Sequence, residues 1–195
     1  MPHIDEDRRA FARSRSVYRP AIIETAKYSG FCMVKDLSPE GVMVETCADL
    51  DEGDLLRLGF TEHEMLAGQV VWSAGGRLGI RFACPIDVSK VLGGSASEEP
   101  TRPPRLPIVC TVEVADSVTS SRNQVLNIST RGFRIKSSAF KVGEKLFVEI
   151  TGMPRKKAVV RWTGEGETGF EFLMPLSYGE LESWTVRRQT DTEAA

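Results

Sequence analysis

The sequence predicts an all-β protein of two tandem six-stranded antiparallel barrels, each followed by a short helix. Three observations carry this prediction. The chain contains an internal repeat, each copy has six short apolar or β-branched segments separated by turn residues, and each copy ends in a helix-forming segment. A small antiparallel barrel closes its own sheet edges, so each copy has enough strands to fold alone.

The composition is that of an ordinary globular protein. The chain has 195 residues, of which 41% are hydrophobic and 27% charged, with a net charge of −2; these values exclude disordered and collagen-like chains. No apolar stretch approaches the roughly 18 residues of a membrane span. The first 19 residues carry acids and arginines instead of the apolar region of a secretory signal, so we expect a cytosolic location.

The repeat begins at a polar turn. The segment Asp36–Gly41 aligns with Asn127–Gly132 at an offset of 91 residues. Glycine, tryptophan and proline then match in the same order at an offset of 90: Gly53 with Gly143, Trp72 with Trp162, and Pro85 with Pro175. We therefore expect a first domain at 1–93, a small polar linker at 94–100, a second domain at 101–188 and a disordered tail at 189–195.

Short strands alternate with glycine-rich or acidic turns in both copies. The expected strands of the first copy are 21–25, 31–35, 42–46, 55–60, 69–73 and 78–82, and those of the second are 109–114, 124–128, 133–136, 145–150, 158–163 and 168–172. Ser177 and Glu180 have capping-box spacing, with Leu181 and Trp184 on one face of the helix that they begin. A shorter helix is expected at 87–92.

Cysteines and histidines offer little for catalysis or metal binding. The four cysteines form no C-x-x-C pair and lie beside apolar residues, so we expect buried, reduced thiols: Cys32, Cys47, Cys84 and Cys110. Only His3 and His63 are present, which poorly supplies a metal site or a catalytic triad. Phosphate-loop, nucleophile-elbow and zinc-protease motifs are absent from the sequence, and we expect no enzyme activity, metal or cofactor.

The N-terminal arm is rich in arginine, with five arginines within 12 residues: Arg8, Arg9, Arg13, Arg15 and Arg19. Guanidinium groups bind phosphate in a bidentate manner and stack on aromatic rings. Such an arm suits a ligand with phosphates and purine rings. The alternatives are a solvated basic leader or a weak nucleic-acid tail, although a net charge near zero argues against general polyanion binding.

A turn of the form D-x-S-x-x-G lies between two expected strands of the first copy. The Asp36 carboxylate could accept hydrogen bonds from a guanine edge, the Ser38 hydroxyl could donate or accept, and Gly41 permits a positive φ or a close backbone approach. Aspartate and serine are also common turn formers, so a purely structural role is the alternative.

Together, the R-x-x-x-R arm (Arg9 to Arg13) and the D-x-S-x-x-G turn resemble the PilZ domain family, whose members are cyclic di-GMP receptors on a six-stranded barrel with a C-terminal helix. The resemblance covers nearly the whole chain as two tandem copies. It implies that Arg9 and Arg13 hold phosphates and stack on guanine, with Arg8 as a further platform. It also implies that Asp36 and Ser38 contact guanine edges and that Gly41 shapes the turn. Ala12 stands where family members often have proline.

The second copy departs from this pattern. Its turn keeps Asn127, Ser129 and Gly132, but upstream Arg102 and Arg105 have only two intervening residues. We expect this degenerate second site not to bind the nucleotide in the usual way.

Three other features of the sequence give weaker indications of a functional site. We interpret Trp72 and Trp162 as repeated core or rim residues in preference to ligand platforms, and the basic run 154–157 as a solvated turn in preference to a phosphate site. We interpret the acidic residues of 49–54 as a turn without full calcium-ligand spacing.

The leading hypothesis is a cyclic di-GMP receptor in which the first barrel binds and the second relays the signal to an unknown protein partner. The main alternative is a PilZ-like protein-interaction module that binds no nucleotide. A nucleic-acid-binding barrel that uses the arginine arm fits less well, because the chain is slightly acidic. Homodimer formation is compatible with the sequence, but no residue specifies it.

Overall fold

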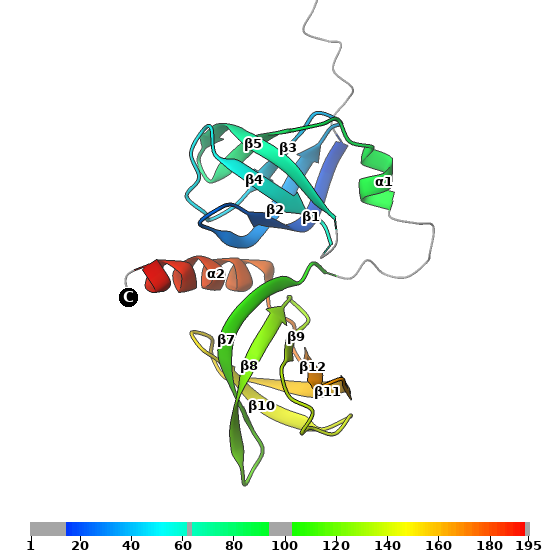
Figure 1. Cartoon of the computed structure of the whole chain (residues 1–195), viewed down its shortest axis with the longest axis vertical. Coiled ribbons are helices and arrows are strands. Elements are labelled where there is room, and N and C mark those ends of the chain that lie inside the picture. Colours follow the sequence, from blue (N-terminus) through cyan, green and yellow to red (C-terminus); the bar gives the residue numbers. More distant parts are fainter. Residues whose placement is uncertain (1–14, 62–63, 94–102, 194–195) are drawn as a thin grey trace, which may run out of the picture.

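The computed structural model describes residues 15–61, 64–93 and 103–193. Within them the chain forms two closed six-stranded barrels, each followed by a helix (Figure 1), which confirms the predicted fold class. All strand pairings are antiparallel.

The first barrel has the strand order β1-β2-β3-β6-β5-β4. Its elements are β1 (Arg15–Glu24), β2 (Ser29–Leu37), β3 (Gly41–Glu45), β4 (Leu55–Gly59), β5 (Met65–Ala74), β6 (Arg77–Phe82) and α1 (Val88–Gly93). Side chains alternate between the barrel interior and its outer surface: Leu78, Ile80 and Phe82 of β6 are buried, whereas Arg77 and Arg81 are exposed.

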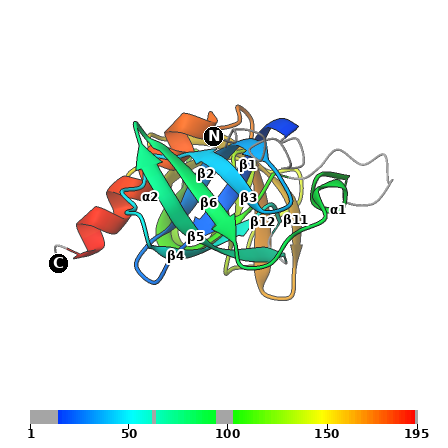
Figure 2. The same cartoon turned by 90° about the horizontal axis from the view of Figure 1, so that it is seen from above.

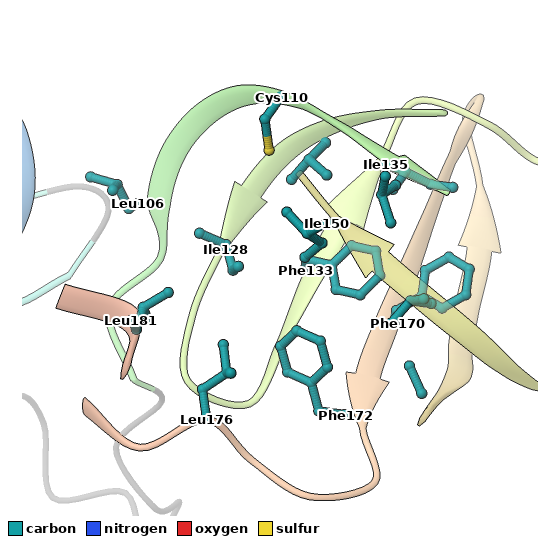
Figure 3. Close-up of a cluster of buried hydrophobic side chains, with 14 of the residues drawn as sticks. Leu106, Cys110, Ile128, Phe133, Ile135, Ile150, Phe170, Phe172, Leu176 and Leu181 are labelled. Carbon is teal, nitrogen blue, oxygen red and sulfur yellow. The ribbon is translucent and has the colours of Figure 1, made fainter. Parts of the chain in front are cut away.

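The second barrel repeats this topology, with the order β10-β11-β12-β9-β8-β7. Its elements are β7 (Leu106–Ala115), β8 (Ser120–Ile128), β9 (Gly132–Ile135), β10 (Lys145–Ile150), β11 (Lys156–Gly164), β12 (Glu167–Phe172) and α2 (Tyr178–Glu193). Figure 3 shows part of its interior, where Phe133 and Phe170 stack with ring centroids 5.0 Å apart.

The first strand of each copy begins earlier than predicted. β1 starts at Arg15 and β7 at Leu106, and both contain a register shift, between Ser16 and Arg19 and between Pro107 and Cys110. A bulge interrupts the two-residue alternation that marks a strand in a sequence, so the pattern becomes visible only beyond it. Arg15 and Arg19 therefore belong to β1 and not to a free arm.

The capping box of α2 is confirmed. The Ser177 hydroxyl accepts a hydrogen bond from the Glu180 N–H at 3.2 Å, and the Glu180 carboxylate accepts one from the Ser177 N–H at 2.8 Å. The helix continues to Glu193, five residues beyond the end that we predicted for the second domain. It is longer than its counterpart α1, which spans six residues.

α2 lies between the two barrels (Figure 1). Leu181 and Trp184 are buried in the core of the second barrel, as Figure 3 shows for Leu181, and the Trp184 indole N–H donates to the Thr151 carbonyl at 2.9 Å. On the side of the first barrel, the Tyr178 ring meets the Phe31 ring edge-on, with centroids 6.4 Å apart. Seen from above, α1 and the C-terminal end of α2 project at opposite edges of the molecule (Figure 2). The C-terminal helix thus contributes to both barrels.

The expectation about cysteines is half wrong. All four thiols are free, but only Cys32 and Cys110 are buried, while Cys47 and Cys84 are exposed. Cys47 follows β3 and Cys84 follows β6, and short apolar neighbours in the sequence do not place a strand-end residue in the core.

None of the helices in the described ranges is long and apolar enough to cross a membrane.

Candidate functional site

One row of residues crosses four strands on the outer face of the first barrel. Asp36 of β2 pairs with Met43 of β3, Met43 pairs with Gly79 of β6, and Gly79 pairs with Trp72 of β5. Neighbouring strands lie about 4.8 Å apart, so the row brings together an acid and an indole separated by 36 positions in the chain. It runs along the floor of a shallow surface cavity.

The cavity has a volume of about 320 Å³. Its lining includes Asp36, Ser38, Gly41, Met43, Trp72 and Arg81. All three residues of the D-x-S-x-x-G turn therefore line one hollow, together with two residues, Trp72 and Arg81, that our sequence analysis did not assign to a site. This size falls near the lower end of the usual range for small-molecule sites.

A hydrogen bond holds the Asp36 side chain. Ser16 of β1 lies directly opposite Asp36 in the strand register, and its hydroxyl donates to Asp36 Oδ1 at 3.0 Å. A carboxylate has several lone pairs, so Asp36 keeps the capacity to accept further hydrogen bonds from a ligand. Ser16 thus orients the Asp36 carboxylate and leaves its other lone pairs available to a ligand.

Ser38 has a structural role in the turn. Its hydroxyl donates to the Gly41 carbonyl at 3.0 Å and accepts from the Gly41 N–H at 3.2 Å, and its own N–H donates to the same carbonyl at 2.9 Å. The hydroxyl proton is thereby used inside the turn. Ser38 remains half-buried, with acceptor capacity on the cavity side.

Gly41 is required for a close approach of two strands. Its φ does not lie in the left-handed region. A Cβ at this position would lie only 2.6 Å from the backbone oxygen of Ile80, so any side chain would force β3 away from β6. Of the two roles that the sequence suggested for this glycine, the structure shows the close approach.

Trp72 forms a flat surface beside the turn. Its side chain is 40% exposed and lies over Gly79, where a Cβ would stand 1.9 Å from the indole nitrogen. Of the core and rim positions that the sequence allowed for Trp72, the structure shows the rim position. The signal in the sequence was the matched pair of tryptophan and glycine in both copies, Trp72 with Gly79 and Trp162 with Gly169.

Arg19 lies away from the cavity. Its guanidinium donates to the carbonyls of Val91 and Leu92, each at 3.2 Å, and lies 5.4 Å from the centre of the Phe60 ring. Burial lowers the pKa of this arginine from its ordinary value. Arg19 therefore binds the C-terminal end of α1. The arm residues Arg8, Arg9 and Arg13 fall outside the described residues.

The second barrel has the corresponding row, but its polar turn is covered. Asn127, Arg134, Gly169 and Trp162 are paired in the same way. Asn127 is only 3% and Ser129 only 1% exposed, whereas Asp36 and Ser38 are half-buried. The Asn127 side-chain oxygen is buried without a hydrogen-bond partner. The retained Ser129 repeats the turn bond of Ser38, with its hydroxyl 3.2 Å from the Gly132 carbonyl.

The strand register also places the upstream arginines of the second copy. Ser16 pairs with Asp36, and Pro107 pairs with Asn127, so the two copies correspond at an offset of 91 up to this point. On that correspondence Arg105 stands at the position of Ser14, and Pro104 stands at that of Arg13. Arg105 therefore does not replace either motif arginine. Arg102 lies outside the described ranges.

The basic turn near residue 155 is occupied by contacts within the fold. Arg155 and Lys157 lie 4.4 and 5.1 Å from the centre of the Phe147 ring, and Lys156 forms an ion pair with Glu180 at 3.6 Å.

In the acidic turn of residues 49–54, the Asp54 carboxylate accepts a hydrogen bond from the Asp51 N–H at 3.0 Å. Among the residues that the structure describes, no group of three acids, cysteines or histidines could hold a metal ion.

Comparison with known proteins gives a family match that covers the first barrel. Residues 7–92 match the family model described as the PilZ domain. A search of curated proteins returned no match. Similar solved structures include the motility inhibitor MotI/DgrA of Bacillus subtilis (14% identity, 91% of this chain and 99% of that chain covered, TM-score 0.38). They also include PlzA of Borreliella burgdorferi in complex with c-di-GMP (13%, 87% and 88%, 0.35) and YcgR of Escherichia coli in complex with c-di-GMP (10%, 90% and 86%, 0.34).

Proposed function

Because residues 7–92, which include the first barrel, match the PilZ domain family model, we propose that the chain is a cytoplasmic receptor for cyclic di-GMP without catalytic activity of its own. The single observation that carries the proposal is the cavity in which the D-x-S-x-x-G turn meets Trp72. This hollow presents a hydrogen-bond acceptor and a flat aromatic surface at the two ends of one cross-strand row.

The described residues supply the contacts for a guanine base. Guanine carries N–H donors on one edge, and the Asp36 carboxylate, oriented by Ser16, is an acceptor for them. The exposed face of Trp72 supports stacking of a purine ring. Ser38 adds an acceptor at the edge of the turn, and Gly41 keeps the two strands close enough to form the floor.

The arm supplies the positive charge. Arg9 and Arg13 would hold the phosphodiester groups and stack on guanine, with Arg8 as an additional platform, as in the family motif. Arg15 begins β1, and its strand partner Leu37 directly follows Asp36. Arg9 and Arg13 precede Arg15 by six and two residues, so the arm that carries them joins β1 beside the cavity, and a chain of this length is long enough to reach a ligand there.

The second barrel would not bind the nucleotide but would transmit its binding to a protein partner. Its turn residues Asn127 and Ser129 are buried, and its upstream segment lacks arginines in the register of the motif. Its helix α2 packs against the first barrel through Phe31 and Tyr178. The two barrels therefore share a helix through which a change in one can reach the other.

Calorimetric titration with cyclic di-GMP tests the proposal. The variant Arg9→Ala/Arg13→Ala should lose at least about 100-fold in affinity, because two charge-assisted phosphate contacts disappear. Asp36→Ala should lose about 10-fold or more through the guanine edge. The matched control, Arg102→Ala/Arg105→Ala, removes two arginines from the equivalent segment of the second copy and should bind as the wild type does.

Two results would contradict the receptor proposal: no heat of binding from folded wild-type protein in a titration confirmed by a second method, or equal losses in the control variant. In the first case the protein-interaction module becomes the better interpretation, since the geometry of Ser38 and Gly41 is fully explained by the turn itself.

A further inference from the structure

Arg81 occupies the row next to Trp72 on the outer face of the first barrel. It lies on β6 between Gly41 of β3 and Gln69 of β5. Its neighbours in the chain, Ile80 and Phe82, are buried inside the barrel, so the Arg81 side chain points outward. Gly79, which lies beneath the Trp72 indole, is two residues away on the same face of the strand.

The Arg81 guanidinium is free to bind a ligand. The residue lines the cavity with Asp36, Ser38 and Trp72, and its side chain forms no ion pair within the described part of the chain. Its two strand partners are the uncharged Gly41 and Gln69. Arg77 on the same strand differs, since it pairs with Glu45 in the strand register and lies outside the cavity.

The second barrel carries the opposite charge at the equivalent position. Gly132 of β9 pairs with Glu171 of β12 in the register in which Gly41 pairs with Arg81. Glu171 forms an ion pair with Arg161 of the neighbouring strand. A carboxylate here repels an anionic ligand, and its arginine partner is already neutralised. The repeat thus keeps the tryptophan and inverts the charge beside it.

We propose that Arg81 is a further ligand-contacting residue that binds a phosphate of the cyclic dinucleotide, and that its replacement by Glu171 in the second copy is a further reason why an anionic ligand binds the first barrel. The inference rests on the proposed function. A guanidinium at the cavity wall offers bidentate hydrogen bonds to a phosphodiester of a ligand that lies between Asp36 and Trp72. It supplies positive charge from the rigid barrel, independently of the N-terminal arm.

Charge substitution tests this role. Arg81→Glu installs the residue of the second copy and should weaken cyclic di-GMP binding by about 100-fold or more, whereas Arg81→Lys, which keeps the charge but loses the bidentate geometry, should weaken it by about three- to tenfold. The control Arg77→Glu makes the same charge change on the same strand outside the cavity and should shift the affinity less than about threefold at 0.15 M salt.

The salt dependence gives a second measurement. Removing one phosphate contact should reduce the slope of log affinity against log salt concentration in Arg81→Gln but not in Arg77→Gln. Wild-type binding with unchanged affinity in Arg81→Glu would overturn the inference and leave the receptor proposal standing. Equal losses in Arg81→Glu and Arg77→Glu would overturn it as well, because the effect would then be one of general charge. Absence of binding by the wild type would overturn both proposals.

Discussion

The Glu182 carboxylate of α2 accepts a hydrogen bond from the backbone N–H of Cys47 in the first barrel, with 2.7 Å between Oε1 and N. The side chain is 7% exposed and lies near the buried hydroxyls of Tyr28 and Tyr178. Burial raises the pKa of Glu182 above its ordinary value, although the hydrogen bonds from Cys47 and Thr46 oppose the rise. This contact joins the two barrels through a carboxylate that is costly to bury in its charged form.

The first prediction concerns the pH dependence of stability. A carboxylate whose pKa is raised on folding binds protons more tightly in the folded state, so its ionisation costs stability as the pH rises from about 4.5 through the raised value. Glu182→Gln keeps an acceptor for the Cys47 N–H and removes this loss. At pH 8 the variant should unfold at the wild-type midpoint or up to about 3 °C above it.

Glu180, two residues earlier on the same helix, is the matched control. The capping bonds to Ser177 and the charge of Lys156 lower the pKa of its carboxyl, so its stabilising effect is present at neutral pH and is lost as the pH falls through the lowered value. Glu180→Gln should therefore lower the midpoint at pH 8. Thermal unfolding from about pH 3 to pH 8 measures both, and parallel curves for wild type and Glu182→Gln would contradict the first prediction.

The second prediction separates the two tryptophans. Trp72 and Trp162 are both 40% exposed and cover a glycine of the next strand, so Trp72→Ala and Trp162→Ala should destabilise the protein by similar amounts, about 1 kcal/mol or more. Only Trp72→Ala should also weaken cyclic di-GMP binding, by about tenfold, because stacking is lost in the cavity of the first barrel alone. Equal binding by the two variants would assign Trp72 a purely structural role.

The third prediction concerns the turn glycine of the second copy. A Cβ on Gly132 would lie 2.0 Å from the Phe170 carbonyl oxygen, so Gly132→Ala should destabilise the protein by about 1–3 kcal/mol. A Cβ on Gly164, at the end of β11, would meet nothing within 4 Å beyond its chain neighbours, and Gly164→Ala should change stability by less than about 0.5 kcal/mol. Urea unfolding compares the two, and a neutral Gly132→Ala variant would contradict the role of this glycine in packing.

The fourth prediction concerns thiol reactivity. Two thiols, Cys47 and Cys84, should react with a disulfide reagent in the native protein, and all four should react after denaturation. Burial raises the pKa of Cys110 to about 11 and raises that of Cys32 further, so neither forms the reactive thiolate at neutral pH. Rapid labelling of all four thiols in folded protein would contradict the burial of Cys32 and Cys110.

Much of the fold was predictable because its signals are local. The capping box at Ser177 and Glu180 and the turn at Ser38 and Gly41 each depend on residues three positions apart, and the structure contains both. The early start of β1 was not predictable, since the bulge after Ser16 breaks the alternation. The exposure of Cys47 and Cys84 depends on where a strand ends, which neighbouring apolar residues do not specify.

The residues of the candidate site also fall into those that the sequence predicted and those that it did not. Asp36, Ser38 and Gly41 were found from their spacing in the sequence, and the structure places all three at one cavity. Trp72 and Arg81 could not be assigned to it, because their nearness to Asp36 arises from the pairing of β2 with β3, β3 with β6, and β6 with β5. Nothing in the spacing of the chain reveals that three such pairings share one register.

By itself, the sequence determined that this protein is a duplicated β-barrel with one intact and one altered copy of a polar turn. The tertiary structure alone decided that Asn127 is buried while Asp36 is half-exposed, that Arg81 lines one cavity with Asp36 and Trp72, and that α2 packs between the barrels through Glu182. Turn formation and strand alternation depend on a few neighbouring residues. Cross-strand register and helix docking depend on barrel closure and on long-range packing, which no local pattern encodes.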